Sequence, residues 1–343
     1  MFISGEEEFL AFSMVNDDNK KDVLKELCTY LFSDEYIDFF EQDADNQILD
    51  SIEATFSHSI IGRFVKLLNK ISCPFTLVVE PYYIDQSYRD TFYMYYSNQH
   101  FSVNRSSVRL SFINGMYSRD AFYTAEIEQL NQDFIGSCVI NPLVKGAIGR
   151  TLFSPHFIPF SETECYMRLS AFKLNIFGRP LQVKAFPYRS QDQETMRCAE
   201  ITMLNIFDYY SNSYNDYRIV TPSNIISCEE KHNYERVLPS RGTTYPILTK
   251  VMSEFGFAPR LYTLFGMDNN VFSSLTKNDK LRRILHYYIE SGIPVAVNLT
   301  STVQSSSNEN HSIVCIGHGK SKSDLYKRAS KNCYIPYKNR NNN

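Results

Sequence analysis

The chain has 343 residues, of which 43% are hydrophobic, 14% aromatic and 21% charged. This composition supplies enough apolar material for buried cores, and it excludes both a disordered chain and a small module that needs metal or disulfides to fold. The 35 basic and 38 acidic residues give a net charge of -3, which excludes a global attraction to nucleic acid or to an anionic membrane surface.

The length exceeds the usual size of a single core, and residues 1–186 are expected to form an N-terminal α+β domain. Apolar residues recur at helical spacing within 23–31 and within 60–68, which predicts two amphipathic helices. After Pro74, short runs rich in β-branched and aromatic residues predict strands. These runs lie at 75–79, 108–112, 137–140, 165–169 and 181–185. The charged residues 80–90 are expected to form a salt-bridged loop, and the glycine-bearing run 146–151 a turn.

The pattern of residue types changes again near residue 187, and a strongly apolar helix is predicted from about 198 to 210. A loop bearing proline and serine is expected to follow it. Two further helices, at 245–255 and 280–290, are each expected to stop at a glycine, Gly256 and Gly292 respectively. Strand-like runs follow at 294–299 and 312–316, and residues 320–343 have the composition of a polar, basic, poorly packed tail. The fold class predicted for the chain is therefore α+β.

The eight cysteines are scattered, with no C-x-x-C pair and no Cys/His group at zinc-ligand spacing, so neither a structural metal nor another cofactor is expected. The first eight residues have no basic stretch followed by a long apolar run, which argues against a signal peptide. The apolar runs elsewhere fall short of the roughly 20 residues needed to cross a bilayer. A cytoplasmic protein with reduced thiols is expected.

Cys198 is the residue most suited to chemistry, because it lies in the first turn of the predicted 198–210 helix. Unpaired backbone N–H groups and the positive end of the helix dipole favour a thiolate there. His311, at the start of a predicted strand, is the best candidate for the base that a thiol nucleophile needs. Gln191 or Gln193 is within reach as a donor to the oxyanion of acyl transfer. The other histidines suit the role less well: His58 and His286 lie in predicted helices, His100 and His156 in the N-terminal region, and His232 and His318 in polar loops.

This order of residues resembles the papain-like cysteine peptidases, in particular the branch of double-glycine peptidases that process bacteriocins. Three further landmarks carry the resemblance over residues 187–319: the glycine-led segment 241–244 before a helix, the glycine-x-proline strand 291–297, and the histidine strand 311–318. The resemblance implies a central buried helix on an antiparallel sheet and no cofactor or metal. It implies Cys198 as nucleophile, His311 as general base and acid, and Gln191, or alternatively Gln193, as oxyanion donor. The possible third members that would orient the histidine are Asp324 and Asn332.

The function expected from this resemblance is hydrolysis of a peptide or amide bond in a peptide or protein substrate through an acyl-enzyme. The alternative is a catalytically silent papain-like domain that acts as a binding or assembly module. Neither nucleic acid nor a membrane is expected as a partner. The region before residue 187 resembles the amino-terminal parts of uncharacterised bacterial proteins, and no activity is attached to it. The resemblance rests on the residue patterns of segments 79–90, 134–142 and 148–151.

Overall fold

A computed structural model of the chain describes residues 12–32, 67–100, 103–143, 148–157, 164–233, 237–240, 242–262, 277–300, 310–319 and 335–338. The chain divides into two compact units: unit 1 comprises Met1–Pro159 and Ala171–Asp192, and unit 2 comprises Phe160–Ser170 and Gln193–Asn343. Both units combine helices with strands, so the mixed α+β architecture is confirmed. The division predicted near residue 186 falls within the second segment of unit 1, and the roles assigned to the two domains stay predictions.

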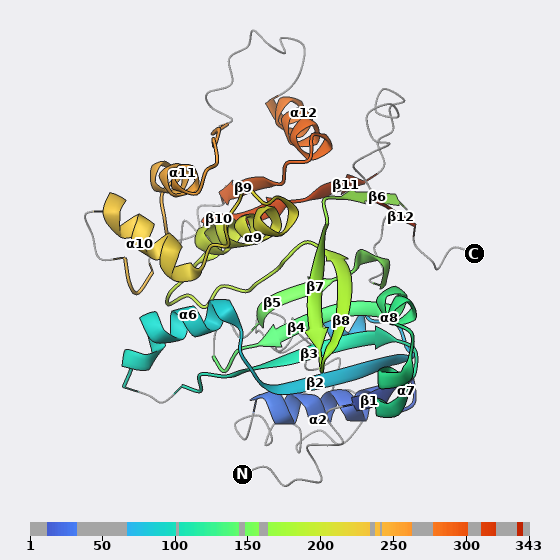
Figure 1. The fold of residues 1–343 in the computed structure, drawn as a ribbon. Coiled ribbons are helices and arrows are strands. Elements are labelled where there is room, and N and C mark those ends of the chain that lie inside the picture. The colour runs from blue at the N-terminus through green and yellow to red at the C-terminus, as the bar shows by residue number, and fades with distance from the viewer. Residues whose placement is uncertain are drawn as a thin grey trace. The chain divides into compact units, whose positions relative to one another are not determined.

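Unit 1 is built on a five-stranded antiparallel sheet with the strand order β1-β2-β3-β4-β5 (Figure 1). Its central strands are buried on both faces, and β4 is buried along its whole length. Such continuous apolar runs are what a sheet covered on both sides requires. The strands are β1 (Phe12–Val15), β2 (Phe75–Tyr83), β3 (Ser107–Asn114), β4 (Phe134–Ile140) and β5 (Ile148–Phe153).

One face of this sheet is covered by α2 (Lys20–Phe32), which lies along it in Figure 1 and confirms the helix predicted at 23–31. Val23, Leu24 and Leu27 follow helical spacing and pack with Leu77 and Phe112 of the sheet in one core cluster. The helix predicted at 60–68 is described only from residue 67, and its remainder lies outside the described residues.

The opposite face is covered by α7 (Arg119–Thr124), α8 (Ile127–Asp133) and the hairpin of β7 (Ser170–Ile176) with β8 (Arg179–Ala185). In β7 the side chains of Phe172, Leu174 and Ile176 are buried in strict alternation with exposed residues, the pattern of a strand with one face on a core. Phe177 and Gly178 connect the two strands with positive φ at both positions, as a tight two-residue turn requires.

Unit 2 is centred on α9 (Cys198–Ser213), which confirms the predicted apolar helix and its start at Cys198. Met203 and Phe207 of α9 pack with Ile225 of α10 (Pro222–His232) and Val251 of α11 (Tyr245–Glu254) in one core cluster. On another side α9 contacts β10 (Asn310–Cys315), which pairs antiparallel with β9 (Val295–Thr300). The result is a largely buried helix between two other helices and a β-hairpin.

The remaining strands of unit 2 form a small antiparallel sheet in which β6 (Glu164–Met167) lies between β11 (Gly317–Gly319) and β12 (Ile335–Lys338). Only Ile316 separates β10 from β11 along the chain. The helix α12 (Lys277–Glu290) contacts both β9 and β11. The short helices of unit 1 not yet named are α6 (Gln86–Met94), η2 (Tyr96–Asn98) and η3 (Pro155–Phe157).

Four of the predicted segments differ in the structure. The expected turn at 146–151 is β5 from Ile148 onward, paired with β4. The expected loop after α9 contains α10, whose Pro222 occupies the first turn, where a missing N–H costs nothing. The expected charged loop at 80–90 includes α6, capped by Asp85, which accepts a hydrogen bond from the N–H of Tyr88 at 2.8 Å. The tail contributes β12.

Within the ranges that the structure describes, every helix is either too short or too polar to cross a membrane.

Candidate functional site

Cys198 is half-buried at the first position of α9, and a neighbouring segment holds this helix start in place. The backbone N–H of Arg197 donates to Oε2 of Glu200 at 3.2 Å, and the hydroxyl of Ser240 donates to Oε1 of the same carboxyl group at 3.1 Å. The guanidinium Nε of Arg197 donates to the carbonyl of Ser240 at 2.6 Å. The thiol is therefore carried by a helix start that these hydrogen bonds hold in place.

Two buried carboxyl groups lie close to each other at this helix start, a pairing that no sequence pattern predicted. Glu200 is 1% exposed and Glu229 of α10 is 3% exposed. Burial raises the pKa of Glu200, against the opposing hydrogen bonds from its own backbone, Ser240 and Arg197. Burial, and then the neighbouring Glu200, raise the pKa of Glu229 to about 8. Glu229 is therefore protonated at neutral pH, which avoids two adjacent negative charges in the interior.

His311 is the second residue of β10, opposite Leu299 of β9. Its side chain is exposed, and so are those of Leu299 and Ile313 on the same strand face, at 48% and 40%. Because α9 contacts β10, the structure brings the helix of Cys198 and the strand of His311 together. The ring of His311 makes no hydrogen bond with the residues that the structure describes.

The two glutamines fall in different surroundings. Gln191 is half-buried in the last segment of unit 1, next to Asp192, whose carboxylate accepts a hydrogen bond from the Tyr96 hydroxyl at 2.9 Å. Gln193 is exposed in unit 2 with a positive φ of 66°, and its N–H donates to the carbonyl of Met196 at 3.3 Å. This turn leads directly into α9. The choice between the two as oxyanion donor stays a prediction.

Asp324 and Asn332, the possible third members, lie outside the described residues. Their roles stay predictions as well.

A group that the sequence did not reveal brings together His286, Glu290 and His318, which we call the α12–β11 cluster. Nε2 of His318 lies 2.8 Å from Oε1 of Glu290, and Nε2 of His286 lies 3.8 Å from the same oxygen. Burial and the neighbouring His318 lower the pKa of His286, against the opposite effect of Glu290. His286 lies in a helix as predicted, whereas His318 lies in β11, and its placement in a polar loop was wrong.

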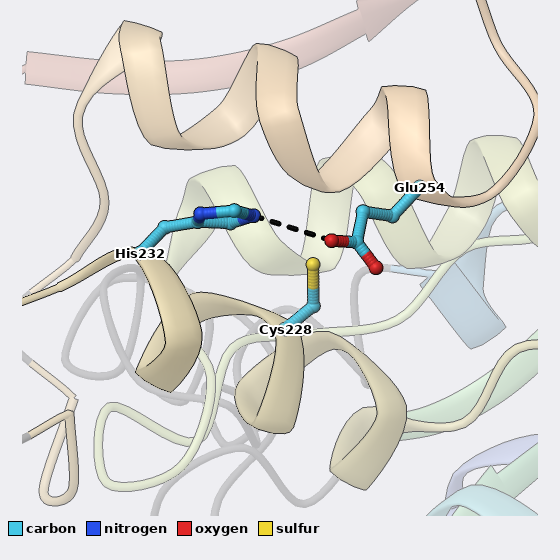
Figure 2. A group of neighbouring side chains, drawn as sticks. All are labelled: Cys228, His232 and Glu254. Carbon is cyan, nitrogen blue, oxygen red and sulfur yellow. Dashed lines mark ion pairs between the residues drawn. The ribbon is translucent and has the colours of Figure 1, made fainter.

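A second group, the α10–α11 cluster, comprises Cys228, His232 and Glu254 (Figure 2). Cys228 and His232 are one turn apart on α10, so their side chains share a helix face. Nε2 of His232 lies 3.3 Å from Oε1 of Glu254 on α11, as the dashed line in Figure 2 marks. The prediction that His232 lies in a polar loop was wrong, because α10 extends to this residue.

Cys228 and His232 are four residues apart, but this segment was expected to be a loop, so the pair was missed. The partners Glu254 and His318 lie far along the chain from the residues they meet, and only the packing of the elements brings them in. Local spacing alone carries no signal for such contacts.

Comparison with known proteins identifies no relative of this chain. The chain matches no protein-family model, and neither a curated protein nor a solved structure proved similar to it.

Proposed function

We propose that unit 2 is a papain-like thiol hydrolase, either a cysteine peptidase or an amidase, in which Cys198 is the nucleophile. The observation that carries the proposal is the packing of α9, which begins at Cys198, against β10, which carries His311 near its start. A nucleophile at a helix start, with a histidine on an adjoining strand, is the arrangement that the resemblance to papain-like peptidases implies. The substrate is a peptide or protein, and we place the enzyme in the cytoplasm.

In this reaction His311 takes the proton of the Cys198 thiol, and the sulfur forms a bond to the carbonyl carbon of the substrate. The N–H of Cys198 and the side chain of Gln191, or of Gln193, donate hydrogen bonds to the oxyanion that develops. The carbon–nitrogen bond then breaks, and the leaving amine takes the proton from the imidazolium. A water molecule, deprotonated by His311, finally attacks the thioester, which releases the acid and restores the thiol.

The alternative function is a catalytically silent papain-like module that binds or assembles with a peptide or protein. One observation favours it: the ring of His311 is exposed, and no residue in the described part of the chain holds it by a hydrogen bond. An unsupported histidine pairs less well with a thiol, because no group fixes its tautomer and orientation.

Alkylation of the full chain with iodoacetamide at neutral pH, followed by mass spectrometry of each cysteine, separates the two functions. An active thiolate at Cys198 labels faster than the half-buried Cys73 and Cys315. His311→Ala slows the labelling of Cys198, and His100→Ala, which removes another exposed histidine, leaves it unchanged. Equal labelling of Cys198 and the other half-buried cysteines, insensitive to His311→Ala, would favour the silent module.

A second experiment concerns the group that orients His311. Residues 321–332 lack the alternating apolar pattern of a strand, so we expect the dyad to work without a third residue from this segment. Asp324→Ala and Asn332→Ala should each change the labelling rate of Cys198 by less than about threefold, which corresponds to roughly 0.6 kcal/mol. A drop of about a hundredfold for either variant, or about 2.7 kcal/mol, would identify a third catalytic member.

A further inference from the structure

The α12–β11 cluster gathers three potential metal ligands from two elements. His286 and Glu290 are one helical turn apart on α12, and the pairing of β11 with β6 brings His318 opposite Tyr166 and next to the helix end. The ligand atoms of the three side chains all lie within 4.8 Å of one another. Their side chains are only 14%, 12% and 21% exposed for His286, Glu290 and His318, respectively.

The hydrogen bonds of His318 define which of its nitrogens can act as a ligand. Its Nδ1 lies 2.6 Å from the carbonyl oxygen of Gly319, and because a carbonyl only accepts hydrogen bonds, Nδ1 carries a proton. In the neutral ring the lone pair is then on Nε2, which lies 2.8 Å from Oε1 of Glu290. A lone pair and a carboxylate oxygen repel each other at this distance unless a cation, either a proton or a metal ion, lies between them.

The carboxyl group of Glu290 gives the second indication of a cation. Its other oxygen, Oε2, is buried, and no group in the described part of the chain donates a hydrogen bond to it. A buried carboxylate oxygen without a donor is costly, and a bound cation removes that cost. The guanidinium of Arg168 donates to the backbone carbonyls of Ile289 and Glu290. Arg168 therefore holds the backbone of Glu290 in place.

We propose that His286, Glu290 and His318 bind a divalent transition-metal ion of the zinc class and thereby join α12 to β11. Two imidazole nitrogens and a carboxylate oxygen are typical ligands of Zn²⁺, which binds them at about 2.0–2.1 Å. Two ligands of one tetrahedral ion then lie about 3.3 Å apart, and the observed separations of 2.8 and 3.8 Å lie on either side of this value.

The surroundings of His318 match those of a metal-bound histidine. Such histidines usually donate their other N–H to a carboxylate or a backbone carbonyl, which fixes the ring, and Gly319 supplies that carbonyl here. The ring of Tyr166 stacks on His318, with the ring centroids 5.3 Å apart and the planes at 28°. Three protein ligands leave the fourth position of the ion to a water molecule.

The α10–α11 cluster suits a metal ion less well. Lys231 already lies 3.8 Å from Oε2 of Glu254, so this carboxylate has a cation beside it, and its side chain is 42% exposed. Burial, and then Glu254, raise the pKa of Cys228, which keeps the sulfur protonated rather than in the thiolate form that binds metals. This cluster is the natural control for the proposal, because it has the same number of ligand groups and includes a sulfur.

The test is a zinc titration of the full chain, first freed of metal with a chelator, in competition with a chromophoric indicator. We expect one Zn²⁺ per chain, and we expect Glu290→Gln, which keeps the size of the side chain, to weaken binding by at least about 100-fold. The matched substitution Glu254→Gln should leave the affinity unchanged. Circular dichroism of each variant shows whether it is folded, and His286→Gln gives a second, independent removal of a ligand.

A spectroscopic measurement on the unaltered chain makes the result independent of any variant. X-ray absorption at the zinc edge should show nitrogen and oxygen neighbours without sulfur, and Co²⁺ in place of Zn²⁺ should give no thiolate-to-cobalt charge-transfer band. Sulfur in either spectrum, or loss of binding in Glu254→Gln alone, would assign the ion elsewhere and overturn the proposal. The proposal would also be overturned if the unaltered chain bound Zn²⁺ no more tightly than Glu290→Gln does. This outcome is independent of the reactivity of Cys198.

Discussion

The two units differ in the partners that surround their buried ionisable side chains. In unit 1 the buried Arg109 donates two hydrogen bonds to the carboxylate of Glu80, at 2.6 and 2.7 Å, and a third to the carbonyl of Asn175. Its guanidinium also lies 4.4 Å from the ring centroid of Tyr83. In unit 2 the buried Glu200 and Glu229 are two acids side by side, and burial together with Glu200 raises the pKa of Glu229. The acid of the first unit is thus paired with a base, whereas in the second unit one of two neighbouring acids is held in its neutral form.

This difference indicates different roles for the two interiors. The ion pair of Glu80 and Arg109 joins opposite positions of β2 and β3, and neither charge is left buried without its partner. Two neighbouring buried carboxyl groups, of which one must stay protonated, lower stability when the pH rises, and such costs tend to persist where a site needs them. Glu200 lies in the same first turn of α9 as Cys198, the residue that we propose as nucleophile, and Glu229 neighbours Glu200. We therefore interpret unit 1 as scaffold and unit 2 as the part of the molecule that carries the chemistry.

The largest difference is expected between the reactivity of the buried thiols of unit 1 and that of Cys198 in unit 2. Burial raises the pKa of Cys28 and of Cys138, both in unit 1, from 9.0 to about 12. At neutral pH their thiolate population is then about a thousandfold below that of an ordinary cysteine. In the iodoacetamide experiment these two cysteines should stay unlabelled in the folded chain and react only after denaturation. Labelling of Cys138 at the rate of a surface thiol would show that the sheet of unit 1 opens readily.

Removal of one partner tests the compensated pair. Arg109→Met keeps most of the side-chain volume but leaves Glu80 with a partly buried, unpaired carboxylate, and we expect a loss of about 3–5 kcal/mol of stability. Because the chain contains no tryptophan, urea unfolding is best followed by circular dichroism.

The double variant Arg109→Met with Glu80→Gln is the control for this prediction. It removes both charges, so it should recover most of the lost stability. If the double variant is as unstable as the single one, the loss comes from packing around Arg109 and not from the unpaired carboxylate.

The conflicting acids of unit 2 predict a dependence of stability on pH. The pKa of Glu229 in the folded chain, about 8, lies above the 4.5 of an ordinary glutamate, so between these values the folded state binds more protons than the unfolded state. The contribution of protonated Glu229 to the free energy of unfolding is complete below about pH 4.5, and it is lost as the pH rises towards 8. Glu229→Gln cannot lose a proton, so this pH dependence disappears in the variant. Between these pKa values, the free energy of unfolding of Glu229→Gln relative to that of the wild type should increase by up to about 1.4 kcal/mol per pH unit.

Urea midpoints of the wild type and of Glu229→Gln at several pH values between 5 and 9 test this expectation. Glu254→Gln, which changes the half-exposed acid of α11, is the matched control and should follow the wild type. A constant difference between Glu229→Gln and the wild type across this range would mean that Glu229 is ionised in the folded chain, and the contrast between the units would fail.

Periodicity and local signals predicted most of the elements that carry the candidate site. The apolar run after Cys198 gave α9, and Gly256 and Gly292 marked the ends of α11 and α12. The α10 helix was missed because its proline and serines read as a loop, although proline is well suited to a helix start. The acids behind α9 and the α12–β11 cluster were missed for a different reason. Glu229 and His318 gain their neighbours only when distant segments pack, and no local pattern records such contacts.

The smallest effect is expected to be equal in the two units, because it depends on backbone conformation alone. Gly178 joins β7 to β8 in unit 1 with φ at 86°, and Gly256 ends α11 in unit 2 with φ at 89°. An added Cβ meets no atom within 4 Å at either position, so an alanine there brings only the cost of the left-handed conformation, about 1–2 kcal/mol. Asparagine, which tolerates this conformation better, should cost less at both positions. Urea unfolding of the four variants measures these costs, and a markedly larger loss at Gly256 than at Gly178 would show that the difference between the units extends from their buried charges to their backbone.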